Sequence, residues 1–169
     1  MTGLVTPMPE PVSAASTGIP CSPDRQNSQA HVTRLVAWFE ALSPASLREL
    51  EAFYTPDAYF KDPFNEVRGV ADVRGIFSHM YEALHAPRFV VTGRITEGHQ
   101  CFLTWNFEFY FKAFKTAELQ TVRGGSHLVF TDDGLVSFHR DYWDAAEELY
   151  EKLPLVGGLM RWLKRRASQ

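Results

Sequence analysis

Apolar residues change their spacing along this chain, from a helical repeat before Pro87 to an alternating pattern after it. Between Ala30 and Leu42 they recur every three or four positions, which predicts an amphipathic helix. A short second helix is expected from Ser46, and a third from Val70 to Leu84. Between these two helices, the aromatic segment from Ala58 to Asp62 predicts a short strand.

Four long segments after Pro87 alternate apolar and polar positions and predict antiparallel strands joined by hairpin connections. In the second segment the odd-numbered positions from Leu103 to Phe111 are apolar, so one face of this strand is expected to be buried. Gly124-Gly125 in the third segment predicts a bulge or bend that lets the sheet curve. The four expected strands are Phe89–Thr96, Cys101–Ala113, Leu119–Phe130 and Leu135–Trp143. Helices followed by such strands predict an α+β domain, in which a strongly curved, mostly antiparallel sheet folds around the N-terminal helices.

The two ends of the chain differ from this central domain, which we expect to span residues 29–153. Residues 1–28 are rich in Pro, Ser, Thr and Ala, have no secretory signal pattern, and predict a disordered tail. Residues 154–169 predict a basic amphipathic helix. Docking of this helix on the domain is the commoner interpretation, and contact with an anionic membrane surface is the alternative.

Composition narrows the classes of partner. The 13 Phe, 6 Tyr and 4 Trp residues predict either an aromatic core or an aromatic cavity. A net charge of -3 gives no general attraction to nucleic acid, so no nucleic-acid partner is expected. Cys21 and Cys101 lie in such different contexts that no disulfide is expected, and the scattered histidines show no metal-ligand spacing. The sequence therefore predicts a cytoplasmic protein that uses no metal and no cofactor.

Asp62 follows an apolar, aromatic stretch and is followed by Pro63. Pro63 has no backbone N–H and favours an extended Asp62, so the strand is expected to stop with this carboxylate at its end. A carboxylate in this position is typical of an Asx turn. Among aromatic side chains it is also a candidate general base, and the local pattern leaves both interpretations open.

The last predicted strand, Leu135–Trp143, places His139, Asp141 and Trp143 on one face. A carboxylate beside an imidazole fixes the tautomer of the ring, which is a common arrangement in acid–base sites. A solvated polar face is the alternative interpretation. The opposite face of the sheet predicts an apolar patch that would favour a homodimer, formed by Phe102, Tyr110, Val129, Phe138 and Tyr142.

The order of these motifs resembles that of NTF2-like proteins of the ketosteroid isomerase and SnoaL-like polyketide cyclase type. In the run FYTPDAYFKDPFNEVRGVADVRGIFSHMYEAL an Asp-Pro ends a short strand and a Gly precedes the third helix. The run FTDDGLVSFHRDYWD looks like the last hairpin of that family, with an acidic-Gly turn and a closing Tyr-Trp pair. The resemblance covers about Ala30 to Asp144 and implies a cone of helices packed into a bent sheet.

The resemblance also implies a site. Asp62 falls at the position of the general base of the isomerases. The two oxyanion donors of the isomerases, a Tyr and a protonated Asp, fall on Trp38 and Ser126, so the activity of a typical steroid delta-isomerase is not expected. His139 and Asp141 are further candidate catalytic residues, because they would point into the cone. The candidate pocket residues are Trp38, Phe60, Phe77, Trp105, Ser126 and Trp143.

The function expected from these residues is binding of a small hydrophobic ligand that is steroid-, terpene- or polyketide-like. With Asp62 as general base and no metal, the chemistry would be proton transfer next to a carbonyl, as in isomerisation or cyclisation, or hydrolysis. The alternative is a noncatalytic ligand-binding or dimeric interaction module of the same fold.

Overall fold

The structure is a computed structural model that describes residues 23–113, 116–152, 158, 162, 165 and 166. Its helical elements are α1 (Pro23–Glu40), the 3-10 helix η1 (Ser46–Ala52), α2 (Val70–Ala83), α3 (Ala145–Glu148) and the 3-10 helix η2 (Tyr150–Lys152). Its strands are β1 (Tyr54–Lys61), β2 (Glu66–Arg68), β3 (Leu84–Glu97), β4 (Gln100–Phe111), β5 (Gln120–Phe130) and β6 (Val136–Tyr142). The predicted α+β class is confirmed.

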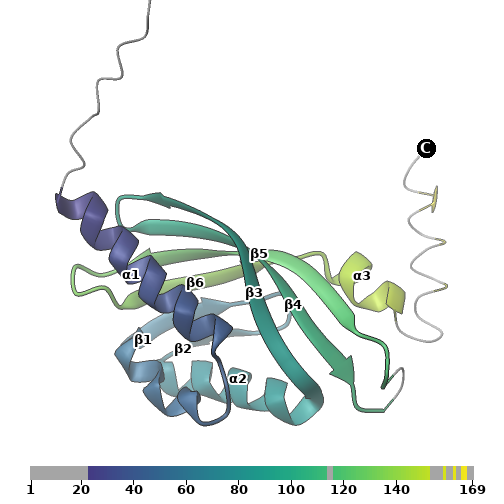
Figure 1. Cartoon of the computed structure of the whole chain (residues 1–169). Helices are drawn as coiled ribbons and strands as arrows, with labels where there is room; N and C mark the ends of the chain where they lie inside the picture. The colour runs from purple at the N-terminus through teal and green to yellow at the C-terminus, as the bar shows by residue number, and fades with distance from the viewer. Residues whose placement is uncertain (1–22, 114–115, 153–157, 159–161, 163–164, 167–169) are drawn as a thin grey trace, which may run out of the picture.

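The strands form one open sheet in the order β2-β1-β6-β5-β4-β3. The pairing is antiparallel except between β1 and β6, which run parallel. The long strands curve together over α2, while α1 lies along the sheet and packs against β3 (Figure 1). This is the bent sheet folded around N-terminal helices that the sequence predicts.

The alternation predicted for the second long strand is confirmed. Leu103, Trp105 and Phe109 of β4 are buried, and they face helices whose apolar residues recur at helical spacing. In α2 these are Val70, Val73 and Phe77. The core therefore lies between the concave face of the sheet and the two long helices.

The bulge predicted at Gly124-Gly125 is wrong. β4 and β5 pair in unbroken register through both glycines. A Cβ at Gly124 would come within 2.4 Å of the Trp105 ring, and one at Gly125 within 2.6 Å of the Phe102 ring. The glycines thus make room for two large rings on opposite faces of β4, and the register shifts that accompany curvature lie in other strand pairs.

Several element ends differ from the prediction. α1 starts at Pro23, β1 starts at Tyr54 instead of Ala58, and β3 starts directly after α2 and runs through Pro87. Pro87 is tolerated because β3 is an edge strand with a register shift beside it. The short edge strand β2 lies between β1 and α2, in a segment for which the sequence predicts no strand.

The ends of the chain are only partly described. Residues 23–28 of the predicted tail belong to α1, and the rest of that tail lies outside the described residues. Most of the predicted C-terminal basic helix also lies outside them. α3 is short and is capped by Asp144, whose carboxylate accepts hydrogen bonds from the backbone N–H groups of Ala146 and Glu147. None of the helices in the described part has the length and apolar character needed to cross a bilayer.

Candidate functional site

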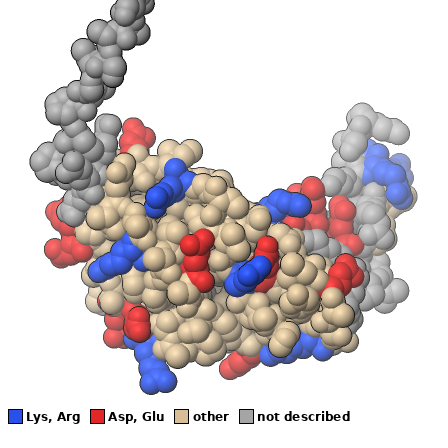
Figure 2. Space-filling view, viewed as in Figure 1, with Lys and Arg blue, Asp and Glu red and all other residues tan. Residues whose placement is uncertain are grey.

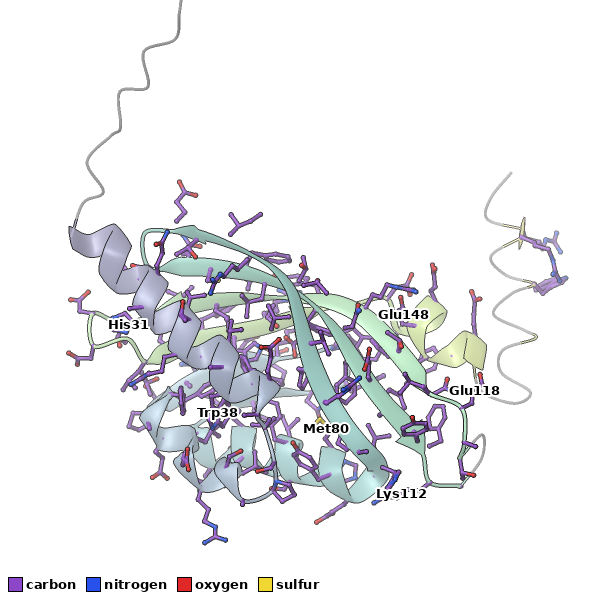
Figure 3. The ribbon with its side chains drawn as sticks, in the orientation of Figure 1. His31, Trp38, Met80, Lys112, Glu118 and Glu148 are labelled. Carbon is purple, nitrogen blue, oxygen red and sulfur yellow. The ribbon has the colours of Figure 1, made fainter. Side chains whose placement is uncertain are left out.

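A cavity of about 690 Å³ lies between α2 and the concave face of the sheet. Met80 of α2 lines it and points toward the strands (Figure 3). The size is typical of a small-molecule site. The aromatic side chains that line the cavity are Phe60, Phe64, Phe77, Phe89, Trp105, Phe107, Phe109, Phe111 and Trp143. The surplus of aromatic residues in the sequence therefore builds a cavity wall as well as a core.

Asp62 and Asp141 both line this cavity. β1 and β6 pair in parallel with Phe60 beside His139 and Lys61 beside Arg140. Continuing that register brings the next residues, Asp62 and Asp141, to matching positions on neighbouring chain segments. Since side chains two residues apart share a face, both carboxylates stand on the cavity side, beyond Phe60 and His139.

The carboxylate of Asp141 is held by donors from two directions. His139 Nε2 lies 2.8 Å from Asp141 Oδ1, and the Ser126 hydroxyl donates to the same oxygen. Ser126 in turn accepts a hydrogen bond of 2.8 Å from the indole N–H of Trp105. Among the described residues no donor contacts Asp141 Oδ2. One oxygen is therefore fixed, and the other can accept a proton or a hydrogen bond from a ligand.

His139 is placed by a second buried partner. Tyr54 Oη lies 2.7 Å from His139 Nδ1, and the two side chains are only 1% and 2% exposed. A neutral imidazole with its hydrogen on Nε2 satisfies both contacts, because Tyr54 then donates to Nδ1 and Nε2–H donates to Asp141. A protonated ring would leave the Tyr54 hydroxyl hydrogen without an acceptor in the described part of the chain. The neutral tautomer is therefore the one that fits.

Tyr54 acts only as a hydrogen-bond donor in this arrangement. Burial, and to a lesser extent the negative charge of Asp141, raises the pKa of Tyr54 well above its usual range. The phenol therefore stays protonated at neutral pH. The hydrogen bond from Tyr54 ends on His139 and the one from Trp105 ends on Ser126, and these two residues contact the carboxylate of Asp141.

Asp62 has a different environment. Its Oδ1 accepts hydrogen bonds from the backbone N–H groups of Phe64 at 2.7 Å and Asn65 at 2.6 Å, and the side-chain amide of Asn65 contacts both carboxylate oxygens. This is the geometry of an Asx turn, which connects β1 to β2. Asp62 thus combines a turn role with a place on the cavity wall, so the two interpretations of its sequence context do not exclude one another.

The six predicted pocket residues fall in three different places. Phe60, Phe77, Trp105 and Trp143 line the cavity. Ser126 and His139 line a separate, much smaller cavity of about 10 Å³, which shares Trp105 and Asp141 with the large one. Trp38 lies outside the cavity lining, where it stacks on Phe53 with ring centroids 4.7 Å apart. Trp38 and Ser126, which the resemblance puts at the two oxyanion positions, therefore do not line the same space.

Two residues of the site carry no clear signal in the sequence. Tyr54 precedes the predicted start of the strand, because Thr55-Pro56 interrupts the alternation that would have linked it to Ala58 and Phe60. Asn65 lies outside every helix and strand that the sequence predicts, and its contacts with Asp62 depend on the turn that brings β2 beside β1. Both are missed for the same reason. An irregular backbone breaks the alternation from which the face of a side chain is predicted.

An open groove adjoins the cavity at the two carboxylates. Both spaces are lined by Asp62, Phe64, Asn65, Asp141 and Trp143, and the groove adds Lys61, Glu66, Arg140 and Asp144. Lys61 forms an ion pair with Glu66, and the Arg140 guanidinium lies over the ring of Tyr142. The carboxylate pair thus stands where the aromatic cavity meets a polar opening.

The open curved sheet and the helices packed inside it define an NTF2-like α+β fold. The sequence profile described as a SnoaL-like domain matches residues 35–139. The chain therefore belongs to the SnoaL-like family.

Solved structures share this fold at low sequence identity. A Jannaschia sp. CCS1 protein proposed to be a SnoaL-like polyketide cyclase has 16% identity and a TM-score of 0.64, covering 75% of this chain and 91% of that one. A Catenulispora acidiphila protein with a ketosteroid isomerase-like fold, in complex with trimethylamine, has 15% identity and a TM-score of 0.59. The match covers 70% of this chain and 88% of that one. An LEH-like epoxide hydrolase of M. tuberculosis has 11% identity and a TM-score of 0.59. The match covers 82% of this chain and 93% of that one. No curated protein matches this chain.

Proposed function

We propose that this protein is a small-molecule enzyme that binds a hydrophobic, ring-bearing ligand in the α2 cavity and moves a proton next to a carbonyl. The observation that carries the proposal is the pair Asp62 and Asp141, at matching positions on β1 and β6 at the edge of an aromatic cavity. A carboxylate that faces an apolar ligand, away from bulk water, is suited to take a proton from carbon. Steroid-, terpene- or polyketide-like ring systems have the apolar character of the cavity wall.

Asp141 is the group that we propose takes the proton. Its Oδ1 is fixed by Ser126 and His139, while its Oδ2 has no donor in the described part of the chain. Asp62, the base expected from the sequence, remains the second candidate for this role, although its oxygens are both engaged by Asn65. His139 is buried and has partners on both ring nitrogens, so it acts through Asp141 as a positioning residue.

Exchange of carbon-bound hydrogen tests this proposal without knowledge of the natural substrate. The two-ring ketone 2-tetralone, incubated with protein in D₂O, is analysed by mass spectrometry for deuterium next to the carbonyl, after subtraction of the buffer rate. We expect the rate above buffer to fall about 100-fold or more in Asp141→Asn, in line with removal of a general base. Asp133→Asn, an exposed change on the β5–β6 turn, is the matched control. Equal rates for wild type and Asp141→Asn would refute Asp141 as the base.

A noncatalytic ligand-binding module is the second candidate function. It is favoured by the hydrogen bonds of Asp62, which give this carboxylate a structural role that needs no catalysis. Binding of 2-tetralone without any exchange above buffer would support this candidate. Hydrolysis by a water held between the carboxylates is a variant of the enzymatic proposal, and it would appear as turnover of epoxide or ester probes in place of exchange.

The outer face of the sheet supports a homodimer in either case. Phe102 is 38% exposed and Tyr142 is 44% exposed on this face, and their rings lie 6.4 Å apart. Phe138 stacks on Tyr59 and meets the ring of His127 edge-on, which extends the apolar surface. Light scattering would measure the mass of the particle, and Phe102→Glu with Tyr142→Glu should yield a monomer. A monomeric wild type would exclude the dimer.

A further inference from the structure

The charge of the cavity wall has one sign. Three aspartates line the cavity, Asp62, Asp72 and Asp141, and among the described residues of the wall there is no Lys or Arg. The wall also contains His79, which is exposed on α2 at the edge of the cavity. Asp62 and Asp141 thus face a largely apolar cavity whose described wall contains no Lys or Arg to pair with them.

Lys61 and Arg140 line the open groove that adjoins the cavity at the two carboxylates, but they do not line the cavity itself. They precede Asp62 and Asp141 in the chain, so their side chains lie on the opposite face of their strands. Lys61 is also already paired with Glu66. Lys and Arg elsewhere on the surface are mixed with Asp and Glu on the face shown in Figure 2, so they form no single basic patch there.

The aromatic part of the cavity wall also favours a positively charged ligand. The faces of aromatic rings attract cations, and the attraction grows when both partners are shielded from water. Phe60, Phe64 and Trp143 line the cavity together with Asp62 and Asp141. An anionic ligand would meet repulsion from the carboxylates and from the ring faces, while an organic cation would be attracted by both.

We propose that the ligand of this cavity is a hydrophobic organic cation, a protonated or quaternary amine attached to a ring system. This inference rests on the proposed function, because it assigns a substrate class to the same cavity. Asp62, whose oxygens are fixed by Phe64 and Asn65, serves as the counter-ion of the ammonium group. Asp141 keeps its free Oδ2 for the proton transfer, so the two carboxylates have separate roles.

The test compares ligands of equal shape and different charge. Equilibrium dialysis of the full chain is performed with (2-naphthylmethyl)trimethylammonium, with its neutral isostere 2-neopentylnaphthalene, and with the anion 2-naphthylacetate. We expect the cation to bind roughly ten-fold or more tightly than the neutral isostere, and the anion to bind most weakly. Asp62→Asn should reduce the preference for the cation at least about five-fold. Glu97→Gln, an equal change of charge at the exposed end of β3, should leave it unchanged.

Each result separates the two proposals. Equal or tighter binding of the neutral isostere would overturn the cationic class while leaving the cavity as a ligand site. A cation preference that persists in both Asp62→Asn and Asp141→Asn would place the bound cation elsewhere and also overturn the inference. Failure of all three probes to bind would refute the cavity as a ligand site, and with it the proposed function.

Discussion

The phenol of Tyr54 lies 2.7 Å from the imidazole of His139, a buried contact that fixes the ring whose other nitrogen contacts the carboxylate of Asp141. Tyr54 comes from the start of β1, and His139 comes from the middle of β6. The ring of His139 also packs edge-on against Phe60, with centroids 4.8 Å apart. Asp141 is thus held by His139, whose ring is fixed by contacts with β1, and by Ser126 of β5.

Tyr54→Phe should destabilise the fold. The change keeps the ring but removes the donor to His139 Nδ1, which leaves a buried acceptor unsatisfied. The expected loss is about 1–3 kcal/mol in the free energy of unfolding. Urea denaturation followed by circular dichroism measures it. Tyr110→Phe is the control, because the Tyr110 hydroxyl has no hydrogen bond to the described residues, and an equal loss in both variants would contradict the role of Tyr54.

Alkaline pH should lower the stability of the folded protein through Tyr54. The pKa of Tyr54 is raised in the folded state by burial and by Asp141, whereas in the unfolded chain it returns to about 10. The unfolded state therefore releases the proton first, so this contribution to stability is complete below pH about 10 and is lost as the pH rises further. Urea unfolding from pH 8 to 11 should show a steeper decline for wild type than for Tyr54→Phe. Parallel curves would contradict the prediction.

Asp62 can be tested as a turn residue independently of any ligand. Asp62→Ala removes the acceptor of two backbone N–H groups, Phe64 and Asn65, and should cost about 1–3 kcal/mol. Asp62→Asn keeps a side-chain oxygen for these donors and should cost clearly less. Thermal and urea denaturation give both values, with the exposed Asp57→Ala as control. Wild-type stability in Asp62→Ala would mean that the turn does not depend on this carboxylate.

Gly124→Ala should disturb the cavity wall. The added Cβ would lie 2.4 Å from the Trp105 ring, so the indole must move away from its contact with Ser126. Overpacking of this kind costs about 1–3 kcal/mol, and a change in tryptophan fluorescence should accompany the loss of stability. Gly75→Ala is the matched control on α2, because nothing lies within 4 Å of its added Cβ and a helix gains up to about 1 kcal/mol from the change.

The face on which each strand residue lies could largely be predicted from sequence. Alternation placed Leu103, Trp105 and Phe109 in the core and put His139 on the same side as Asp141, and the structure agrees. The period of a strand is two residues, so a regular pattern assigns the face directly. Where the backbone is irregular, as at Thr55-Pro56 before β1, the pattern is lost, and the site residue Tyr54 was missed with it.

The roles of the glycines in β5 could not be read from the sequence. A Gly-Gly pair in a strand is typical of a bulge, but the cause here is the size of the partner side chains across β4. Trp105 and Phe102 lie opposite or beside these glycines only in the register that the two strands adopt. The partner of a residue across a sheet is decided by strand pairing, which the local pattern does not specify.

The sequence by itself determined the class of fold, the aromatic character of the interior and the two carboxylates that end their strands, because these depend on residue type and on periodicity within one segment. Only the tertiary structure brought Asp62 beside Asp141. Their proximity results from parallel pairing of β1 with β6, two strands separated by most of the domain, and parallel strands need a long connection that no local pattern records. Pairing of β6 with β5 gave Asp141 its contact with Ser126, and pairing of β6 with β1 gave His139 its contact with Tyr54. Trp38 of α1 stacks on Phe53, outside the cavity lining. Residue spacing alone could not predict these contacts.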